Sequence, residues 1–161
     1  MSETIRVGIA DMNICTAPDK ITTIGLGSCI GVVLYDPTAK VAGLVHIMLP
    51  DSTKIKNNQN KMKFADSGIA MLVEALEKKG ISLAKLKAKI AGGAKMFNFS
   101  SSTDLGSIGD KNIEAVHTIL KQYGIRIVSE DVGLNYGRTI VFNPENSELT
   151  VIKAGKQTNI I

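Results

Sequence analysis

Apolar positions at helical spacing predict a first amphipathic helix over residues 65–79. Its apolar side chains recur at the i, i+3, i+4 and i+7 positions that line one helix face, and they are Ile69, Leu72, Val73 and Leu76. Asp66 is the predicted N-cap, and Gly80 stands just past the predicted end, where glycine is favoured. The segment is therefore expected to bury one face against the rest of the fold.

A second helix is predicted over residues 111–123. Ile113, Val116 and Leu120 fall on one face, Asp110 is the cap candidate and Gly124 is the terminator. His117 shares the apolar stripe, so we expect it either packed against a sheet or exposed at the edge of the stripe.

Short β-branched and apolar runs predict the strands. They cover residues 5–10, the segment around 21–24, and 29–35, 41–49, 86–91, 125–130, 139–143 and 149–153. Together with the helices they predict an α/β chain of the α+β type, with a mixed, mainly antiparallel sheet and helices packed on it. With 161 residues, 44% of them hydrophobic, residues 1–161 are expected to form one domain.

Two apolar runs flank a turn and form a predicted β-hairpin. The turn Asp36-Pro37-Thr38-Ala39 has the Asp and Pro positions of a type I turn. If Asp36 pairs with Ala39, counting back along both strands sets Cys29 opposite His46, and directly opposed side chains share a face. A slip of one residue would turn His46 to the other face, so this contact depends on the register.

A glycine-rich turn leads into the first hairpin strand. Cys29 follows Gly25-Leu26-Gly27-Ser28 directly, so backbone N–H groups near Gly27 and Ser28 can point at an incoming carbonyl oxygen. The turn is therefore a candidate oxyanion hole, with Cys29 as the candidate nucleophile.

An adjacent histidine supplies the chemistry that a cysteine nucleophile needs. A free thiol has a pKa of ~8.5, which a neighbouring imidazolium lowers, and His46 is the candidate base. Thr22 and Thr23 are the nearest oxygen-bearing residues that could orient its ring, and spacing does not choose between them. The alternative is that Cys29 and His46 are two ordinary core residues.

The remaining cysteine and histidine residues suggest no second chemistry. Cys15 has no histidine near it in sequence, and both cysteines are expected to be free thiols; a redox protein would need them within disulfide reach. The dispersed Cys and His residues lack zinc-ligand spacing, so no metal is expected. The loop 91–97 lacks a phosphate-loop pattern; it is expected to pack closely beside the site, with Met96 and Phe97 as apolar anchors.

The net charge of +4 comes from lysines spread along the chain. Few aromatic residues accompany them, so a solvated face that attracts an acidic protein partner is favoured over nucleic-acid binding. The polar segment 52–63 is expected to be a loop that either meets such a partner or has no role. No run approaches the ~20 apolar residues of a spanning helix, and no secretory signal is recognised, so membrane insertion is not expected and a cytoplasmic location is.

Several motifs resemble one protein family. The stretch 23–29 reads TIGLGSC, YD follows at 35–36, and 46–52 reads HIMLPDS. Further similar segments are 64–66, 91–97, 108–116, 130–133 and 137–138. Together they resemble the CheD family of bacterial and archaeal chemoreceptor glutamine deamidases, although Phe64 stands where Tyr is expected and Leu134 where Gly is common.

The resemblance implies a fold, a site and a reaction. The implied fold is a layered sandwich similar to bacterial toxin deamidases. The family's catalytic Cys, His and Thr match Cys29, His46 and Thr23, which selects Thr23 over Thr22. The implied activity is that of a protein-glutamine glutaminase, a cofactor-free amidohydrolase that converts receptor glutamine to glutamate through a thioester.

The resemblance also implies two partners. The substrate would be the cytoplasmic helices of chemoreceptors, and a CheC-type phosphatase of the response regulator would bind the protein. The alternative function is a non-catalytic regulatory module that binds such a phosphatase.

Overall fold

The computed structural model describes residues 2–95, 107–155 and 157–161. Over these residues the strands are β1 Thr4–Val7, β2 Met12–Thr16, β3 Lys20–Leu26, β4 Ile30–Asp36, β5 Val41–Ile47, β6 Lys87–Gly92, β7 Arg126–Val132, β8 Arg138–Asn143, β9 Glu148–Lys153 and β10 Thr158–Ile160. The helices are α1 Ala65–Lys78 and α2 Ile108–Tyr123, with short 3-10 turns at Ser52–Lys54, Lys61–Lys63 and Leu83–Lys85. Met96 and Phe97, predicted as apolar anchors, lie outside the described residues.

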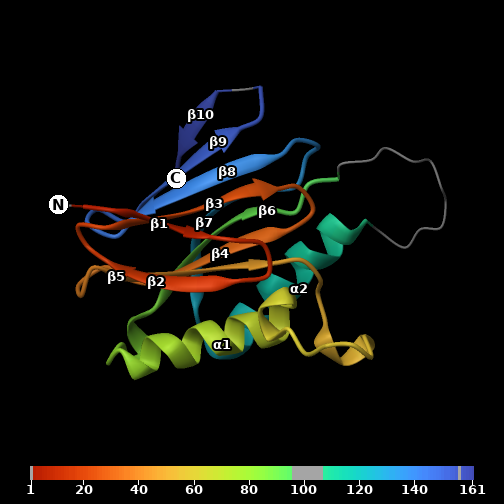
Figure 1. Cartoon of the computed structure of the whole chain (residues 1–161), viewed down its shortest axis with the longest axis horizontal. Helices are drawn as coiled ribbons and strands as arrows, with labels where there is room; N and C mark the ends of the chain where they lie inside the picture. Colours follow the sequence, from red (N-terminus) through yellow and green to blue (C-terminus); the bar gives the residue numbers. More distant parts are fainter. Residues whose placement is uncertain (1, 96–106, 156) are drawn as a thin grey trace.

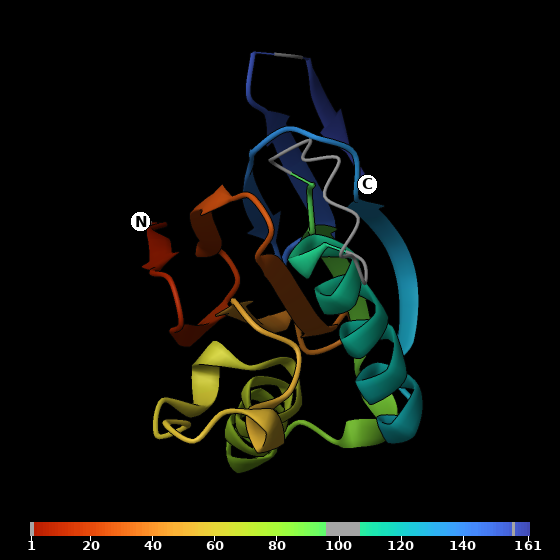
Figure 2. The same ribbon diagram turned by 90° about the vertical axis from the view of Figure 1, so that its right-hand side faces the viewer.

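The strands form two sheets rather than the single sheet that the sequence predicted. The outer sheet has the order β1-β3-β8-β9-β10 and the central sheet the order β2-β5-β4-β6-β7. The β1–β3 and β6–β7 pairs are parallel and the other pairs are antiparallel. Both helices cover the free face of the central sheet, which gives three layers (Figures 1 and 2). The mixed, mainly antiparallel α+β class is confirmed.

The middle strands of the central sheet are buried on both faces, and their side chains alternate between two cores. All seven residues of β4 are buried. Ile30, Val32 and Leu34 pack with the helices, whereas Val33 and Tyr35 pack against the outer sheet. The alternation follows from the two-residue period of a strand. Whether a residue number in β4 or β5 is odd or even therefore tells which core its side chain faces.

Helix α1 begins at the predicted residue and ends one residue earlier than predicted, but its predicted cap is wrong. Phe64 is the N-cap residue and makes no side-chain cap hydrogen bond. Asp66 lies in the first turn, and its carboxylate accepts hydrogen bonds from the Ser52 N–H at 2.9 Å and hydroxyl at 2.7 Å. Asp66 therefore anchors the segment that follows β5 instead of capping its own helix.

Helix α2 begins three residues earlier than predicted. Ser107 is the N-cap, and its hydroxyl accepts from the Asp110 N–H at 3.1 Å, so Asp110 is a first-turn residue. The predicted end at Gly124 is confirmed, and this glycine has the left-handed φ of 72° that a C-terminal cap requires. The earlier start places Gly109 within the helix, packed against the backbone of Gly93 and Ala94.

Two short strands, β2 and β10, were not predicted from the sequence. Strand β2 contains Asn13 and Thr16 within five residues, and β10 has three residues, so neither shows a strand-length apolar run.

Within the described residues no helix combines the length and apolar character needed to cross a membrane. Leu134 has a φ of 60°, a left-handed conformation that glycine adopts without cost, which gives a physical reason for glycine at this position.

Candidate active site

The candidate residues come from three segments at one end of the space between the two sheets. Thr23 lies on β3 of the outer sheet, Cys29 follows the glycine turn just before β4, and His46 lies near the end of β5. Thr23 and His46 are fully buried, and Cys29 is partly exposed. Burial restricts the side chains of Thr23 and His46 to one arrangement, while the Cys29 thiol stays within reach of solvent.

The hairpin register differs from the prediction by two residues. Asp36 pairs with Val41, and His46 lies opposite Gly31 rather than Cys29. The loop has four residues instead of two, because the Asp36 carboxylate accepts from the Thr38 and Ala39 N–H groups and Lys40 takes a positive φ of 56°. The predicted direct opposition of Cys29 and His46 is therefore wrong.

The predicted shared face nevertheless holds, because the offset is an even number. Cys29 and Gly31 are two residues apart and lie on the face of Val33, toward the outer sheet, and Cys29 packs against that core. His46 therefore has Cys29 as its diagonal neighbour, and such neighbours stand ~7–8 Å apart at Cα. Between them Gly31 contributes no side chain.

A buried hydrogen-bond chain sets the tautomer of His46. The single hydroxyl proton of Thr23 goes to the Val7 carbonyl oxygen, at 2.7 Å. The same oxygen lies 2.7 Å from His46 Nδ1, so it must accept a proton from that nitrogen. His46 Nε2 is then the unprotonated nitrogen, and it is buried with no hydrogen-bond partner among the described residues.

Thr22, the other sequence candidate, points elsewhere. Its hydroxyl donates to the Ile140 carbonyl oxygen at 2.7 Å, because consecutive strand residues face opposite ways. The structure thus brings Thr23 and not Thr22 to His46. No hydrogen bond joins Cys29 to His46 in this state, since Nε2 has none.

Burial keeps both reacting groups neutral. It lowers the pKa of His46 from 6.5 to about 4. Burial is also the larger influence on Cys29 and raises the thiol pKa above 9.0, opposed by the hydrogen bond from the residue's own backbone N–H. This differs from the expectation of an imidazolium that lowers the thiol pKa. The pair is a thiol and a neutral base, which must exchange a proton when a substrate arrives.

Hydrogen bonds hold three consecutive carbonyl groups around the nucleophile, those of residues 27–29. Gly27 O accepts from the Ala94 N–H and Cys29 O from the Gly93 N–H, each at 2.8 Å. Ser28 O accepts from the Asn112 side-chain amide, also at 2.8 Å. The N–H of Gly27, predicted to face the oxyanion, instead donates to Gly25 O at 3.2 Å. Within the described residues the N–H groups of Ser28 and Cys29 donate no hydrogen bond to another residue, which leaves these two available to an oxyanion.

Close backbone packing beside the turn requires glycine. Gly92 has a φ of 117°, and a Cβ there would lie 2.1 Å from Cys29 O. Its neighbour Gly93 supplies the N–H that holds the same oxygen. The sequence prediction that this loop packs beside the site is confirmed for these two residues.

Asn112 is a residue of this region for which the sequence predicted no role. It is fully buried on α2, and its amide donates to Ser28 O and, at 2.9 Å, to Met48 O. Its position three residues after Gly109 and four before Val116, all buried, places a polar residue on the apolar stripe. That pattern is the sequence signal that could have revealed it.

The other candidate residues lie apart from this site. Cys15 is buried in β2 among apolar side chains, and burial raises its pKa to about 11. His117 is exposed and lies 2.7 Å from Glu130. Both cysteines are free thiols, and in the described part of the chain no group of three or more Cys, His, Asp or Glu residues could hold a metal.

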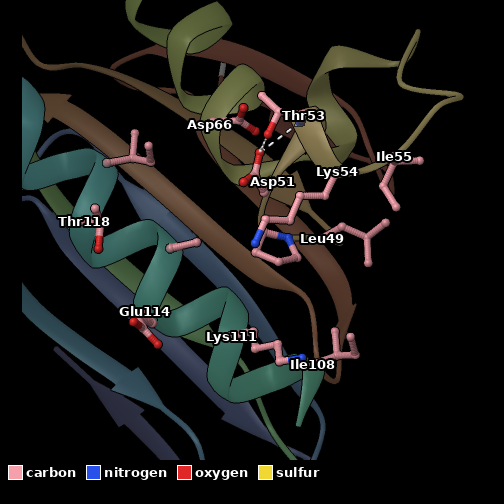
Figure 3. A pocket seen from close by; sticks show the side chains of 13 residues that line it. Leu49, Asp51, Thr53, Lys54, Ile55, Asp66, Ile108, Lys111, Glu114 and Thr118 are labelled. Atoms are coloured by element: carbon pink, nitrogen blue, oxygen red, sulfur yellow. Dashed lines mark hydrogen bonds between the residues drawn. The ribbon is translucent and has the colours of Figure 1, made fainter. Parts of the chain in front are cut away.

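A cleft of about 730 Å³ separates α2 from the segment that follows β5 (Figure 3). Leu49 and Ile119 contribute apolar surface, and Lys54, Lys111 and Glu114 contribute charge. Neither Thr23, Cys29 nor His46 lines it. The cleft is thus a surface separate from the catalytic candidates.

The arrangement can support thiol-dependent acyl transfer. It combines a thiol, a buried neutral imidazole with a free nitrogen, an oriented proton on the other nitrogen, and two backbone N–H groups that donate to no other described residue. These are the parts that an activated nucleophile and an oxyanion site require.

Comparison with known proteins establishes the family. Residues 48–153 match the family model described as CheD chemotactic sensory transduction. A probable chemoreceptor glutamine deamidase CheD of Lachnoclostridium phytofermentans is 59% identical, over 97% of each chain. The probable chemoreceptor glutamine deamidase CheD of Caldanaerobacter subterraneus is 53% identical, over 96% of this chain and 95% of that one. The chain therefore belongs to the CheD family.

Other comparisons agree or add little. The chemoreceptor glutamine deamidase CheD of Halalkalibacterium halodurans is 50% identical over 94% of each chain. Among solved structures, the hypothetical protein YfiH of Bacillus licheniformis is similar with a TM-score of 0.42 and 16% identity, over 72% of this chain and 47% of that chain. A structural likeness at this level does not bear on the function.

Proposed function

We propose that the protein deamidates glutamine side chains of chemoreceptors, with Cys29 as nucleophile, His46 as general base and acid, and Thr23 as the group that orients His46. Membership of the CheD family and the names of its relatives support the reaction. One structural observation carries the residue roles: the Val7–Thr23–His46 chain leaves Nε2 unprotonated and unpartnered on the face that Cys29 shares.

In the acylation step, His46 Nε2 takes the thiol proton while the Cys29 sulfur attacks the glutamine carboxamide carbon. The carbonyl oxygen becomes an oxyanion, which the Ser28 and Cys29 N–H groups hold. The C–N bond then breaks, and the proton on Nε2 goes to the departing nitrogen, which leaves as ammonia. A thioester between the receptor and Cys29 remains.

In the hydrolysis step, the same nitrogen takes a proton from water while the water oxygen attacks the thioester carbon. The C–S bond breaks, and the sulfur regains its proton from the imidazole. The receptor side chain is now glutamate, and the enzyme is restored. Removal of one donor from an oxyanion site costs ~10²–10³ in kcat, so the two N–H groups are a major part of the proposed catalysis.

Ammonia release tests this sequence of steps. Wild-type protein mixed with a receptor cytoplasmic fragment should release one ammonia for each glutamate formed. Cys29→Ser and His46→Gln should each lower the rate by at least ~100-fold, because they remove the nucleophile or the base. Release at the wild-type rate by either variant would contradict the assigned roles.

The proposal places the reaction in the cytoplasm, where the receptor helices that carry the substrate glutamines would lie. Two free thiols in one domain fit a reducing compartment. Fractionation of cells should find the protein with the cytoplasmic fraction, and recovery from the periplasm or medium would contradict this location.

A CheC-type phosphatase is the proposed second partner, and the cleft beside α2 supports a separate binding role. Its lining carries charged side chains of both signs, Lys54 and Lys111 beside Asp51, Asp66 and Glu114, which a partner of complementary pattern could pair with. Lys111→Glu should weaken phosphatase binding at low salt, whereas Cys29→Ala should not. Binding that survives both changes, together with unchanged receptor glutamines in the presence of wild type, would favour the purely regulatory alternative.

A further inference from the structure

A trans peptide ties the direction of each backbone N–H to the carbonyl before it. The carbonyl of one residue and the N–H of the next lie in one plane and point in opposite directions. A hydrogen bond that holds the carbonyl therefore also aims the N–H. In the nucleophile turn this rule links Gly27 O to the Ser28 N–H, and Ser28 O to the Cys29 N–H.

Different groups hold these two carbonyls. The backbone N–H of Ala94 holds Gly27 O at 2.8 Å, so no side-chain change would release it directly. A side chain, the Asn112 amide, holds Ser28 O at 2.8 Å. The direction of the Cys29 N–H thus depends on one residue of α2.

The second hydrogen bond of Asn112 fixes the amide itself. The same nitrogen donates to Met48 O at 2.9 Å, two residues past His46 on the chain. Its oxygen is buried and has no partner in the part of the chain that the structure describes, so within that part its two N–H donors hold the side chain. One NH2 group therefore ties the turn that carries the nucleophile to the end of the strand that carries the base.

We infer that Asn112 is a positioning residue for the reaction: by holding Ser28 O, its amide aims the Cys29 N–H at the developing oxyanion. The inference rests on the proposed function, because it assigns that N–H to the oxyanion of the deamidation. Asn112 is buried and touches no substrate. Its effect must appear in kcat, since the oxyanion forms after the substrate has bound.

The test uses two variants and a matched control. Asn112→Asp keeps the shape but cannot hold both carbonyls, because the carboxyl donates no hydrogen bond when charged and at most one when protonated. Asn112→Leu keeps the approximate size and has no donor. Val116→Ala removes apolar packing one turn further along the buried stripe of α2. All are assayed well below their unfolding midpoints, so that loss of stability alone does not lower the rate.

Both Asn112 variants should lower kcat on a receptor fragment by about 100-fold, the size expected for a misplaced catalytic group, with KM within about threefold. Cys29 alkylation by iodoacetamide forms no oxyanion and should stay within about threefold of wild type. Val116→Ala should keep a near wild-type kcat.

Two results would overturn the inference. One is an unchanged kcat in both Asn112 variants; the other is an equal loss of kcat and of alkylation, which would indicate general disorder of the turn. Deamidation by the wild type in the same assay separates these outcomes from failure of the proposed function itself.

Discussion

Replacing Thr23 by valine removes one hydroxyl and keeps the shape of the side chain. The change leaves His46 Nδ1 buried without its partner and takes one hydrogen bond from the Val7 carbonyl oxygen, since the Thr23 hydroxyl joins both at 2.7 Å. The unsatisfied nitrogen costs about 1–3 kcal/mol and the lost hydrogen bond about 1 kcal/mol, so Thr23→Val should lower the free energy of unfolding by about 2–4 kcal/mol. Urea denaturation measures this loss.

The effect on activity should exceed what the lost stability explains. Without the Thr23 hydroxyl as acceptor, the imidazole proton is no longer held on Nδ1 and can move to Nε2. The fraction of molecules whose Nε2 can accept a proton therefore falls. General base catalysis contributes about 10²–10⁴-fold, so kcat on a receptor fragment should fall by at least ~100-fold below the unfolding midpoint. Thr23→Ser, which retains the hydroxyl, should stay within about tenfold of wild type.

Thr22 offers the matched control on the same strand. Thr22→Val loses one hydrogen bond, to Ile140 O at 2.7 Å, and should cost about 1 kcal/mol with little change in kcat. A Thr23→Val enzyme with wild-type kcat, or an equal loss of kcat in both valine variants, would refute the assignment of Thr23.

Three further results follow from the geometry of the site. Burial lowers the pKa of His46 from 6.5 to about 4, so between these pH values the unfolded chain binds a proton that the native protein does not. The free energy of unfolding should therefore fall by about 3 kcal/mol as the pH drops from 6.5 to 4. In urea denaturation, His46→Gln should lack this part of the pH dependence. Burial raises the Cys29 pKa above 9.0, so its alkylation rate, followed by peptide mass, should still rise at pH 9, and a plateau near neutrality would contradict the neutral pair. Gly92→Ala places a Cβ 2.1 Å from Cys29 O at a φ of 117° and should cost at least about 2 kcal/mol and reduce kcat; the control Gly8→Ala, with no atom within 4 Å, should change neither.

The sequence predicted the helices and most strands because their apolar periodicity is regular over many residues. It failed where a feature is short or depends on a distant partner. Strand β2 shows little alternation in five residues, yet it pairs along β5. The division into two sheets also depends on which faces meet in space, and local periodicity does not contain that information.

The candidate site shows the same limit at the level of single residues. The hairpin count placed Cys29 and His46 on one face, which holds, but the loop was two residues longer than assumed, so Gly31 pairs with His46. Thr22 and Thr23 could not be separated by spacing, since the partner of each hydroxyl comes from another strand. The role of Asn112 needs the approach of α2 to the turn, which the chain order does not reveal.

The mass of individual receptor glutamines tests the central claim most directly. Wild-type protein incubated with a receptor cytoplasmic fragment should add about one mass unit at each modified glutamine, because OH replaces NH2 through the thioester. Cys29→Ala, in a parallel incubation, should leave every glutamine unchanged. An equal mass gain with Cys29→Ala, or no gain with the wild type, would contradict the account.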